Sequence, residues 1–333
     1  MSDAALVVIV AIAIAFDFTN GFHDTANAVA TSVSTRALSP RVAVLIAAVM
    51  NFVGAFSSTK VAKTVGGGLI NTSPGFVTAH LLFAALAGAI VWNLITWRLG
   101  LPSSSTHALI GGLLGAALAR GGSDPVDWSN LWHKTIVPGI ASPIIGFLFA
   151  GLVMLAILWA FRKVRPAPLN RGFRILQIAS GSFLAFAHGT NDAQKTMGVI
   201  ALALYAAGHS SSPTDIPDWV IASAAASMAL GTYIGGWRIM RTMGTRIFKL
   251  RSPQGFAAQA TASTVLYTVA TRYGFPVSTT HVISGSVMGA GATTRVSAVR
   301  WGVAGDMVVA WVLTIPAAAI VAASLYGVLT LVF

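Results

Sequence analysis

Residues 98–116 read RLGLPSSSTHALIGGLLGA, and residues 272–290 read RYGFPVSTTHVISGSVMGA. Nine of the nineteen positions are identical, so the chain carries the same pattern twice. In both copies a proline and a run of hydroxyl residues precede an apolar stretch that contains glycines. This repetition predicts a molecule made of two similar halves.

A second pair of motifs lies upstream of these two stretches. Residues 21–27 read GFHDTAN, and residues 189–195 read GTNDAQK. All four motifs lie in apolar surroundings. Doubled polar motifs inside hydrophobic segments are typical of secondary transporters, in which two structural repeats share one site.

The composition is that of a membrane protein. Apolar residues make up 55% of the chain and charged residues only 9%, whereas a soluble domain has about 25% charged residues. The net charge of +12 does not indicate nucleic acid, because the basic residues are scattered at the ends of apolar segments. That placement favours a protein embedded in the lipid bilayer with basic cytoplasmic flanks.

The predicted fold is an all-α integral membrane protein. Its ten hydrophobic segments are 4–33, 41–58, 76–97, 103–119, 136–161, 175–207, 218–236, 254–271, 277–292 and 303–331. The segments 103–119 and 277–292 are shorter than the roughly 20 residues of a straight span, so we expect short or re-entrant helices there. Asn20-Gly21 and His188-Gly189 interrupt two longer segments, and we expect discontinuous helices at these points.

The basic residues predict the orientation in the membrane. If all ten segments cross and both termini are outside, fifteen basic residues lie in inside loops and five in outside loops, as the positive-inside rule requires. The segments 162–174 and 237–252 are then cytoplasmic. The repeats 1–161 and 175–333 are inverted relative to each other, and 162–174 is a short basic connector. If one segment in each half is instead re-entrant, the halves become parallel.

Asp24 and Asp192 occupy matching positions in the two halves. A charged residue near the centre of a bilayer costs roughly 2.5–3.5 kcal/mol on insertion scales. This cost favours a cavity, a bound cation or a proton at both sites. The alternative is a structural pairing with a nearby basic residue.

The hydroxyl runs favour an oxyanion site, because hydroxyls and the free N–H groups of a helix start both donate hydrogen bonds. The predicted donors are Ser104, Ser105, Thr106, Ser278, Thr279 and Thr280. In the alternative interpretation these hydroxyls bond to their own helix backbone. The pairs Gly111/Gly115 and Gly285/Gly289 are spaced for close helix packing.

Other polar residues of the motifs bear on a coupling cation. Asn27 and Asn191 can bind a cation beside the two aspartates. Lys195 stands where the first half has Asn27, and His23 stands where the second half has Asn191. An ammonium can fill the space of a sodium ion and histidine titrates near neutral pH, so both differences favour protons over sodium. Lys195 can also be a structural partner of Asp192, three positions earlier.

The four motifs resemble those of the inorganic phosphate transporter family. The segments 21–28 and 189–196 are similar to its doubled GANDVANA hallmark, and 102–107 and 276–281 are similar to its Pro-x-Ser-[Ser/Thr]-Thr-His runs. The residues 20–31 and 191–195 are closest to the bacterial low-affinity branch. The resemblance covers nearly the whole chain.

The resemblance implies proton-coupled symport of inorganic phosphate across the cell inner membrane by alternating access. It implies a homodimer and a substrate that is largely a neutral complex of phosphate with Mg²⁺ or another divalent metal. The hydroxyls would bind phosphate, and Asp24, Asn27, Asn191 and Asp192 would bind the cation or metal. His23, His107, Lys195 and His281 are candidates for proton coupling. A sodium-coupled phosphate or sulfate symporter, a channel and a membrane-embedded metal enzyme are the alternatives.

Overall fold

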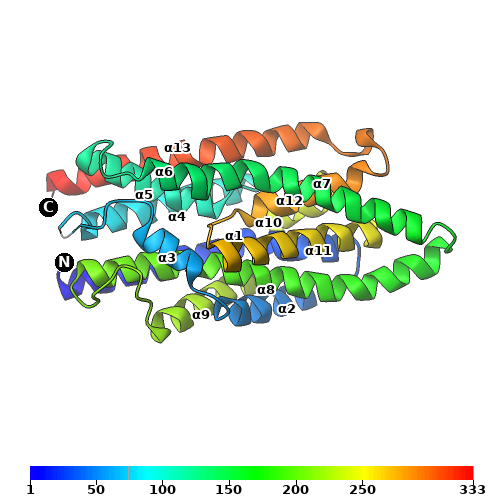
Figure 1. Ribbon diagram of the computed structural model, residues 1–333, viewed down its shortest axis with the longest axis horizontal. Helices are drawn as coiled ribbons and strands as arrows, with labels where there is room; N and C mark the ends of the chain where they lie inside the picture. The colour runs from blue at the N-terminus through cyan, green and yellow to red at the C-terminus, as the bar shows by residue number, and fades with distance from the viewer. Residues whose placement is uncertain (74, 333) are drawn as a thin grey trace.

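The computed structural model describes residues 1–73 and 75–332, and these residues form a helical bundle with one isolated β-bridge between Ile70 and Val126. The predicted all-α fold is confirmed. Figure 1 shows long helices lying side by side along the long axis of the molecule. In chain order the elements are α1 (Asp3–Ser34), α2 (Pro40–Ala55), α3 (Lys60–Gly67), α4 (Ala79–Leu99), α5 (Ser105–Gly121), α6 (Trp128–Leu131), η1 (Trp132–Ile136), α7 (Val137–Ala160), α8 (Pro166–Ala206), α9 (Asp218–Ile234), α10 (Trp237–Arg241), η2 (Thr242–Arg246), α11 (Ser252–Thr268), η3 (Val269–Tyr273), α12 (Thr279–Ala292), η4 (Val296–Ala298) and α13 (Trp301–Val332).

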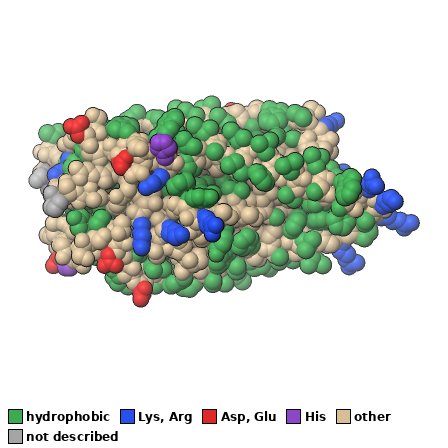
Figure 2. Space-filling view, viewed as in Figure 1, with side chains coloured by type: hydrophobic (Ala, Val, Ile, Leu, Met, Phe, Trp, Pro, Cys, Tyr) green, Lys and Arg blue, Asp and Glu red, His purple; other side chains and the backbone are tan. Residues whose placement is uncertain are grey.

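Each of the ten predicted hydrophobic segments overlaps a helix, although the bounds differ and the number of membrane crossings stays a prediction. Within the described residues, four helices are long and apolar enough to cross a membrane by themselves: α1, α4, α6 to α7, and α13. The count rises to six if the bent pairs α2 with α3 and α9 with α10 are each one span. Apolar side chains cover much of the visible face (Figure 2), as a surface in contact with lipid requires.

The predicted breaks in α1 and α8 are wrong, because both helices run continuously through the motifs. Gly21 and Gly189 serve packing instead. A Cβ atom on Gly21 would collide with the backbone of Met228 in α9, and one on Gly189 would collide with the backbone of Asn51 in α2. The two glycines therefore let neighbouring helices approach closely without interrupting their own.

The connector predicted at 162–174 is shorter in the structure. The turn covers residues 161–165, and α8 begins at Pro166 and includes the rest. Proline suits this place, since the first turn of a helix has no use for the missing N–H. In Figure 1 this turn lies at the end of the molecule opposite the two termini.

The matching helices α1 and α8 run antiparallel. The amino group of Met1 lies 3.4 Å from the carbonyl of Ala206, and at the other end Thr35 donates a 2.7 Å hydrogen bond to Gln177. Contacts between the halves are reciprocal: α5 packs on α13, and its counterpart α12 packs on α7. An inverted repeat predicts both relations.

The predicted close packing at the paired glycines is confirmed. A Cβ atom on Gly111 or Gly115 would collide with the backbone of α13, and one on Gly285 or Gly289 would collide with the backbone of α7.

Both α5 and α12 are short helices that begin in the interior. Every residue from 105 to 117 and from 279 to 291 is buried. The chain reaches these starts through sharp turns at Gly100 (φ 68°) and Gly274 (φ 66°), where only glycine adopts the left-handed conformation without strain. As a result, the two hydroxyl runs are delivered to the centre of the bundle.

Candidate functional site

The four sequence motifs meet where the middles of α1 and α8 face the starts of α5 and α12. Ser105 donates a 2.7 Å hydrogen bond to Oδ2 of Asp24, and Thr279 donates a 3.2 Å bond to Oδ1 of Asp192. The first hydroxyl residue of each short helix thus binds the aspartate of its own half. The two-fold pattern read from the sequence is also a geometric pattern in the site.

Asp24 and Asp192 come together with His188 from α8. One ligand atom from each of these three residues lies within 4.8 Å of the other two, and all three are buried. His188 also pairs with Asn51 through a 3.1 Å contact between Nδ1 and Oδ1, which leaves Nε2 facing Asp192 at 3.4 Å. Two carboxylates and an imidazole are a common ligand set for divalent metals. No role was predicted for His188, which lies one helical turn before Asp192.

Lys195 connects the two halves. Its Nζ atom lies 2.7 Å from Oδ2 of Asp192 and donates a 2.8 Å hydrogen bond to the Thr106 hydroxyl at the start of α5. The pairing with Asp192 was one of the roles expected for Lys195. The ammonium is completely buried and is a positive charge that belongs to the protein.

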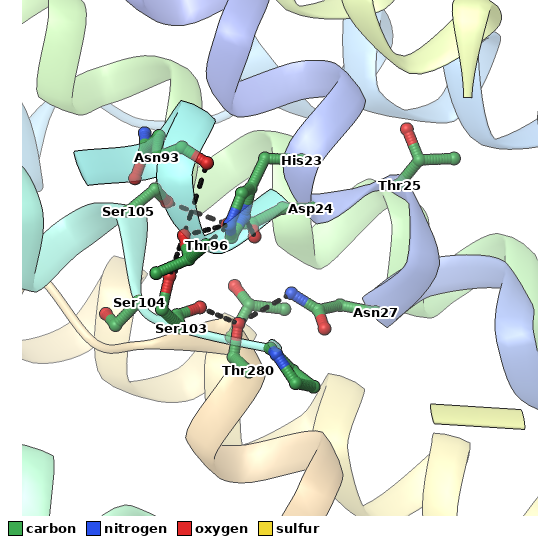
Figure 3. Close-up of polar contacts among 12 residues, drawn as sticks. His23, Asp24, Thr25, Asn27, Asn93, Thr96, Ser103, Ser104, Ser105 and Thr280 are labelled. Carbon is green, nitrogen blue, oxygen red and sulfur yellow. Dashed lines mark hydrogen bonds and ion pairs between the residues drawn. The ribbon is translucent and has the colours of Figure 1, made fainter. Parts of the chain in front are cut away.

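His23 belongs to a polar cluster beside Asp24 (Figure 3). Its Nδ1 lies 2.7 Å from Oδ1 of Asp24, and its Nε2 lies 3.1 Å from the Thr96 hydroxyl and 3.3 Å from that of Ser103. Both ring nitrogens therefore have partners, and Nδ1 faces the carboxylate of Asp24.

The two asparagines each bind the short helix start of the second half. Asn27 donates a 2.8 Å hydrogen bond to Thr280 (Figure 3), and Asn191 donates bonds to Asp192 (2.7 Å) and to the carbonyl of Val277 (2.6 Å). Neither side-chain carbonyl oxygen has a hydrogen-bond partner within residues 1–73 and 75–332. Two buried acceptors are thus free for a cation.

The remaining hydroxyls have defined places. Ser104 and Ser278 accept bonds from the backbone N–H groups of His107 and His281 as helix caps. Thr280 donates to the carbonyl of Ser103, 2.9 Å away. A hydroxyl can accept and donate at once, so the two caps keep their protons for a ligand.

His107 and His281 meet edge to face, with their ring centres 4.8 Å apart. His281 also lies against Trp311 and contacts the carbonyl of Gly139 through Nδ1 at 3.0 Å. Nε2 of both rings lacks a partner in the described chain. The pair therefore lies where the two short helices begin.

Asp17 is a buried acid that the repeat analysis overlooked. It lies on α1, two turns before Asp24, and its side chain is fully buried. The matching position in the second half is Ala185, so comparing the two halves could not reveal it. The signal available was an ionisable residue inside an apolar segment.

The chain matches known transport proteins over nearly its whole length. Residues 20–322 match the profile of the phosphate transporter family. A probable low-affinity inorganic phosphate transporter of Rhizobium meliloti is 50% identical over 322 residues, covering 96% of this chain and 95% of that protein. One from Bacillus subtilis is 46% identical over 327 residues and 98% of both chains. A solved structure described as the sodium-dependent phosphate transporter superimposes with a TM-score of 0.87 at 25% identity, covering 99% of this chain and all of the other.

Proposed function

The chain belongs to the phosphate transporter family, and we propose that it takes up inorganic phosphate together with protons by alternating access. The family and the relatives are transporters, so the membrane-embedded enzyme is ruled out and the chain is a multi-pass membrane protein.

The placement of Lys195 carries the argument for protons. In the first half the carbonyl oxygen of Asn27 has no partner among the described residues and is free for a cation. In the second half the ammonium of Lys195 already binds the aspartate, Asp192. This ammonium occupies the place at the carboxylate that a second sodium ion would need, which disfavours two symmetric sodium sites.

A divalent metal fits as part of the cargo. Asp24, His188 and Asp192 bring their ligand atoms close enough to hold one ion. A bare phosphate would be repelled by the two carboxylates, whereas a metal between them and the anion turns this repulsion into attraction. The phosphate oxygens would then accept hydrogen bonds from Ser104 and Ser278, the cap hydroxyls at the starts of α5 and α12 that keep their protons.

Sodium coupling is the second candidate. A solved protein of this fold is described as a sodium-dependent phosphate transporter, and the free carbonyl oxygen of Asn27 beside Asp24 would suit one sodium ion. Sulfate is the alternative anion, since it has the same tetrahedral shape.

The assembly and orientation are also part of the proposal. The family resemblance supports a homodimer. The basic residues of the turn at 161–165 and the start of α8 support a cytoplasmic location for that end. Both termini lie at the other end (Figure 1) and would then be outside.

Uptake of labelled phosphate into proteoliposomes tests the proposal. A proton gradient and a sodium gradient are applied separately, each with and without Mg²⁺ and with excess sulfate. We expect uphill uptake that is driven by protons, needs the metal and resists sulfate. Sodium drive would overturn the proton coupling, accumulation of sulfate would change the substrate, and the absence of uphill uptake under either gradient would indicate a channel.

A further inference from the structure

The carboxyl group of Asp17 has no bonded partner in the interior of the protein. The side chain is 0% exposed, and neither oxygen has a hydrogen-bond partner among the described residues. Burying an ionised carboxylate without donors or a counter-ion is costly. Asp17 therefore needs a cation or a proton that the protein alone does not provide.

Two other buried polar groups face this carboxyl. Asn20 lies one turn further along α1, and Thr196 reaches it from α8. Both are fully buried, and neither the amide of Asn20 nor the hydroxyl of Thr196 has a partner in the part of the chain described. Three unpartnered polar side chains from two helices meet at one buried point, which is the property of a binding site.

The charges around Asp17 come from α8. Lys195 and Asp192 are the charged groups that act on it, and within the described residues neither forms an ion pair or hydrogen bond with it. The other helices packed on α1 carry charged or titratable residues near their ends: Arg41 in α2, His80 and Arg98 in α4, Asp218 in α9, Arg238 in α10 and His281 in α12.

A proton fits this site better than a metal ion does. Besides the carboxyl of Asp17, the groups that face this point, Asn20 and Thr196, are neutral. The site of Asp24, His188 and Asp192, by comparison, offers a divalent cation two carboxylates and an imidazole. A proton removes the charge, and the resulting O–H group can donate to Thr196 or to the carbonyl of Asn20.

We propose that Asp17 is a proton-binding site of the transport cycle and that it acts on the substrate site through Lys195. When Asp17 is protonated, the ammonium stays on Asp192 and Thr106, as seen here. When Asp17 loses its proton, its negative charge attracts Lys195 away from these two groups. This inference rests on the proposed proton coupling and adds the residue that carries a proton.

The variant Asp17→Asn tests the proposal in the full-length protein reconstituted into liposomes. Two quantities are compared: steady-state accumulation of labelled phosphate under an imposed pH gradient, and exchange of labelled for unlabelled phosphate without a gradient. One coupled proton raises the accumulation ratio about tenfold for each pH unit of gradient. We therefore expect Asp17→Asn to accumulate about tenfold less phosphate per pH unit than the wild type and to retain exchange. Asp17→Glu should restore accumulation.

The matched control is Asp3→Asn, the same substitution on the same helix, at an exposed carboxylate that contacts only His209 in the described structure. Accumulation at the wild-type level by Asp17→Asn would overturn the proposal. Loss of exchange by a folded Asp17→Asn would also overturn it, because such a loss would place Asp17 in substrate binding. If Asp17→Asn does not fold, the pH profile of uptake is measured for Asp17→Glu, and a profile identical to that of the wild type overturns the proposal. A wild-type protein that ignores the pH gradient would instead refute the proposed function itself.

Discussion

The Nζ atom of Lys195 lies 2.7 Å from Oδ2 of Asp192, and both side chains are completely buried. The corresponding pair in the first half is Asn27 and Asp24, without a charge on the asparagine. The two halves thus present similar backbones with different charge at their centre. In the second half the aspartate pairs with the ammonium of Lys195, and in the first half it pairs with the imidazole of His23.

Replacing Lys195 by asparagine should convert the second half into a copy of the first. We expect Lys195→Asn to gain dependence on a sodium gradient in proteoliposome uptake, because an amide and a bare carboxylate can hold a sodium ion. Lys195→Met is the matched control. It also removes the charge but provides no oxygen ligand.

Thermal unfolding separates these two variants further. Removing one partner of a buried ion pair costs about 3–5 kcal/mol, so both should unfold at lower temperature than the wild type. Added sodium should raise the unfolding temperature of Lys195→Asn and not that of Lys195→Met. Equal responses of the two variants to sodium would refute this interpretation of position 195.

The two aspartates should each be indispensable for uptake. Asp24→Asn or Asp192→Asn keeps the shape of the side chain and removes the charge that binds the metal. Mutating a residue that only supports a metal ligand costs about 10–100-fold in metal affinity. Because these aspartates would bind the metal directly, we expect at least that loss in metal-dependent phosphate uptake. Asp306→Asn, at an exposed position of α13, should leave uptake unchanged, and undiminished uptake in either central variant would exclude a shared site.

His188 should set the preference among metals. Imidazole favours ions such as Zn²⁺, whereas carboxylates also suit Mg²⁺. We expect His188→Gln to lower the phosphate uptake supported by Zn²⁺ more than that supported by Mg²⁺. Glutamine can keep a hydrogen bond to Asn51, so the local structure should persist. His80→Gln, at the start of α4, is the control, and a parallel loss with both metals would contradict a ligand role for His188.

The repeat in the sequence predicted which residues meet, since Asp24 with Ser105 and Asp192 with Thr279 lie together as matched pairs. It could not predict the shape of α1 and α8. A glycine either interrupts a helix or lets a neighbour approach, and the outcome depends on whether another backbone lies against it. For Gly21 and Gly189 that backbone comes from distant segments of the chain.

Residues without a counterpart in the other half were the hardest to find. Asp17 matches Ala185, and His188 matches Asn20, so symmetry gave no reason to single them out. Their roles depend on contacts across helices: Asp17 faces Thr196, and His188 comes close to Asp24. Such contacts follow from the packing of α1 on α8, which no local pattern in the sequence specifies.

The packing role of Gly189 can be tested on its own helix. A Cβ atom at this position would collide with the backbone of Asn51, whereas one at Gly172, also in α8, would meet no atom within 4 Å among the described residues. Overpacking costs about 1–3 kcal/mol, and alanine is favoured over glycine in a helix by about 1 kcal/mol where space allows. Gly189→Ala should therefore lower the unfolding temperature in detergent, and Gly172→Ala should keep or raise it. If both variants unfold like the wild type, α2 does not press on α8 at Gly189, and the break in the helix expected from the sequence becomes the better explanation for this glycine.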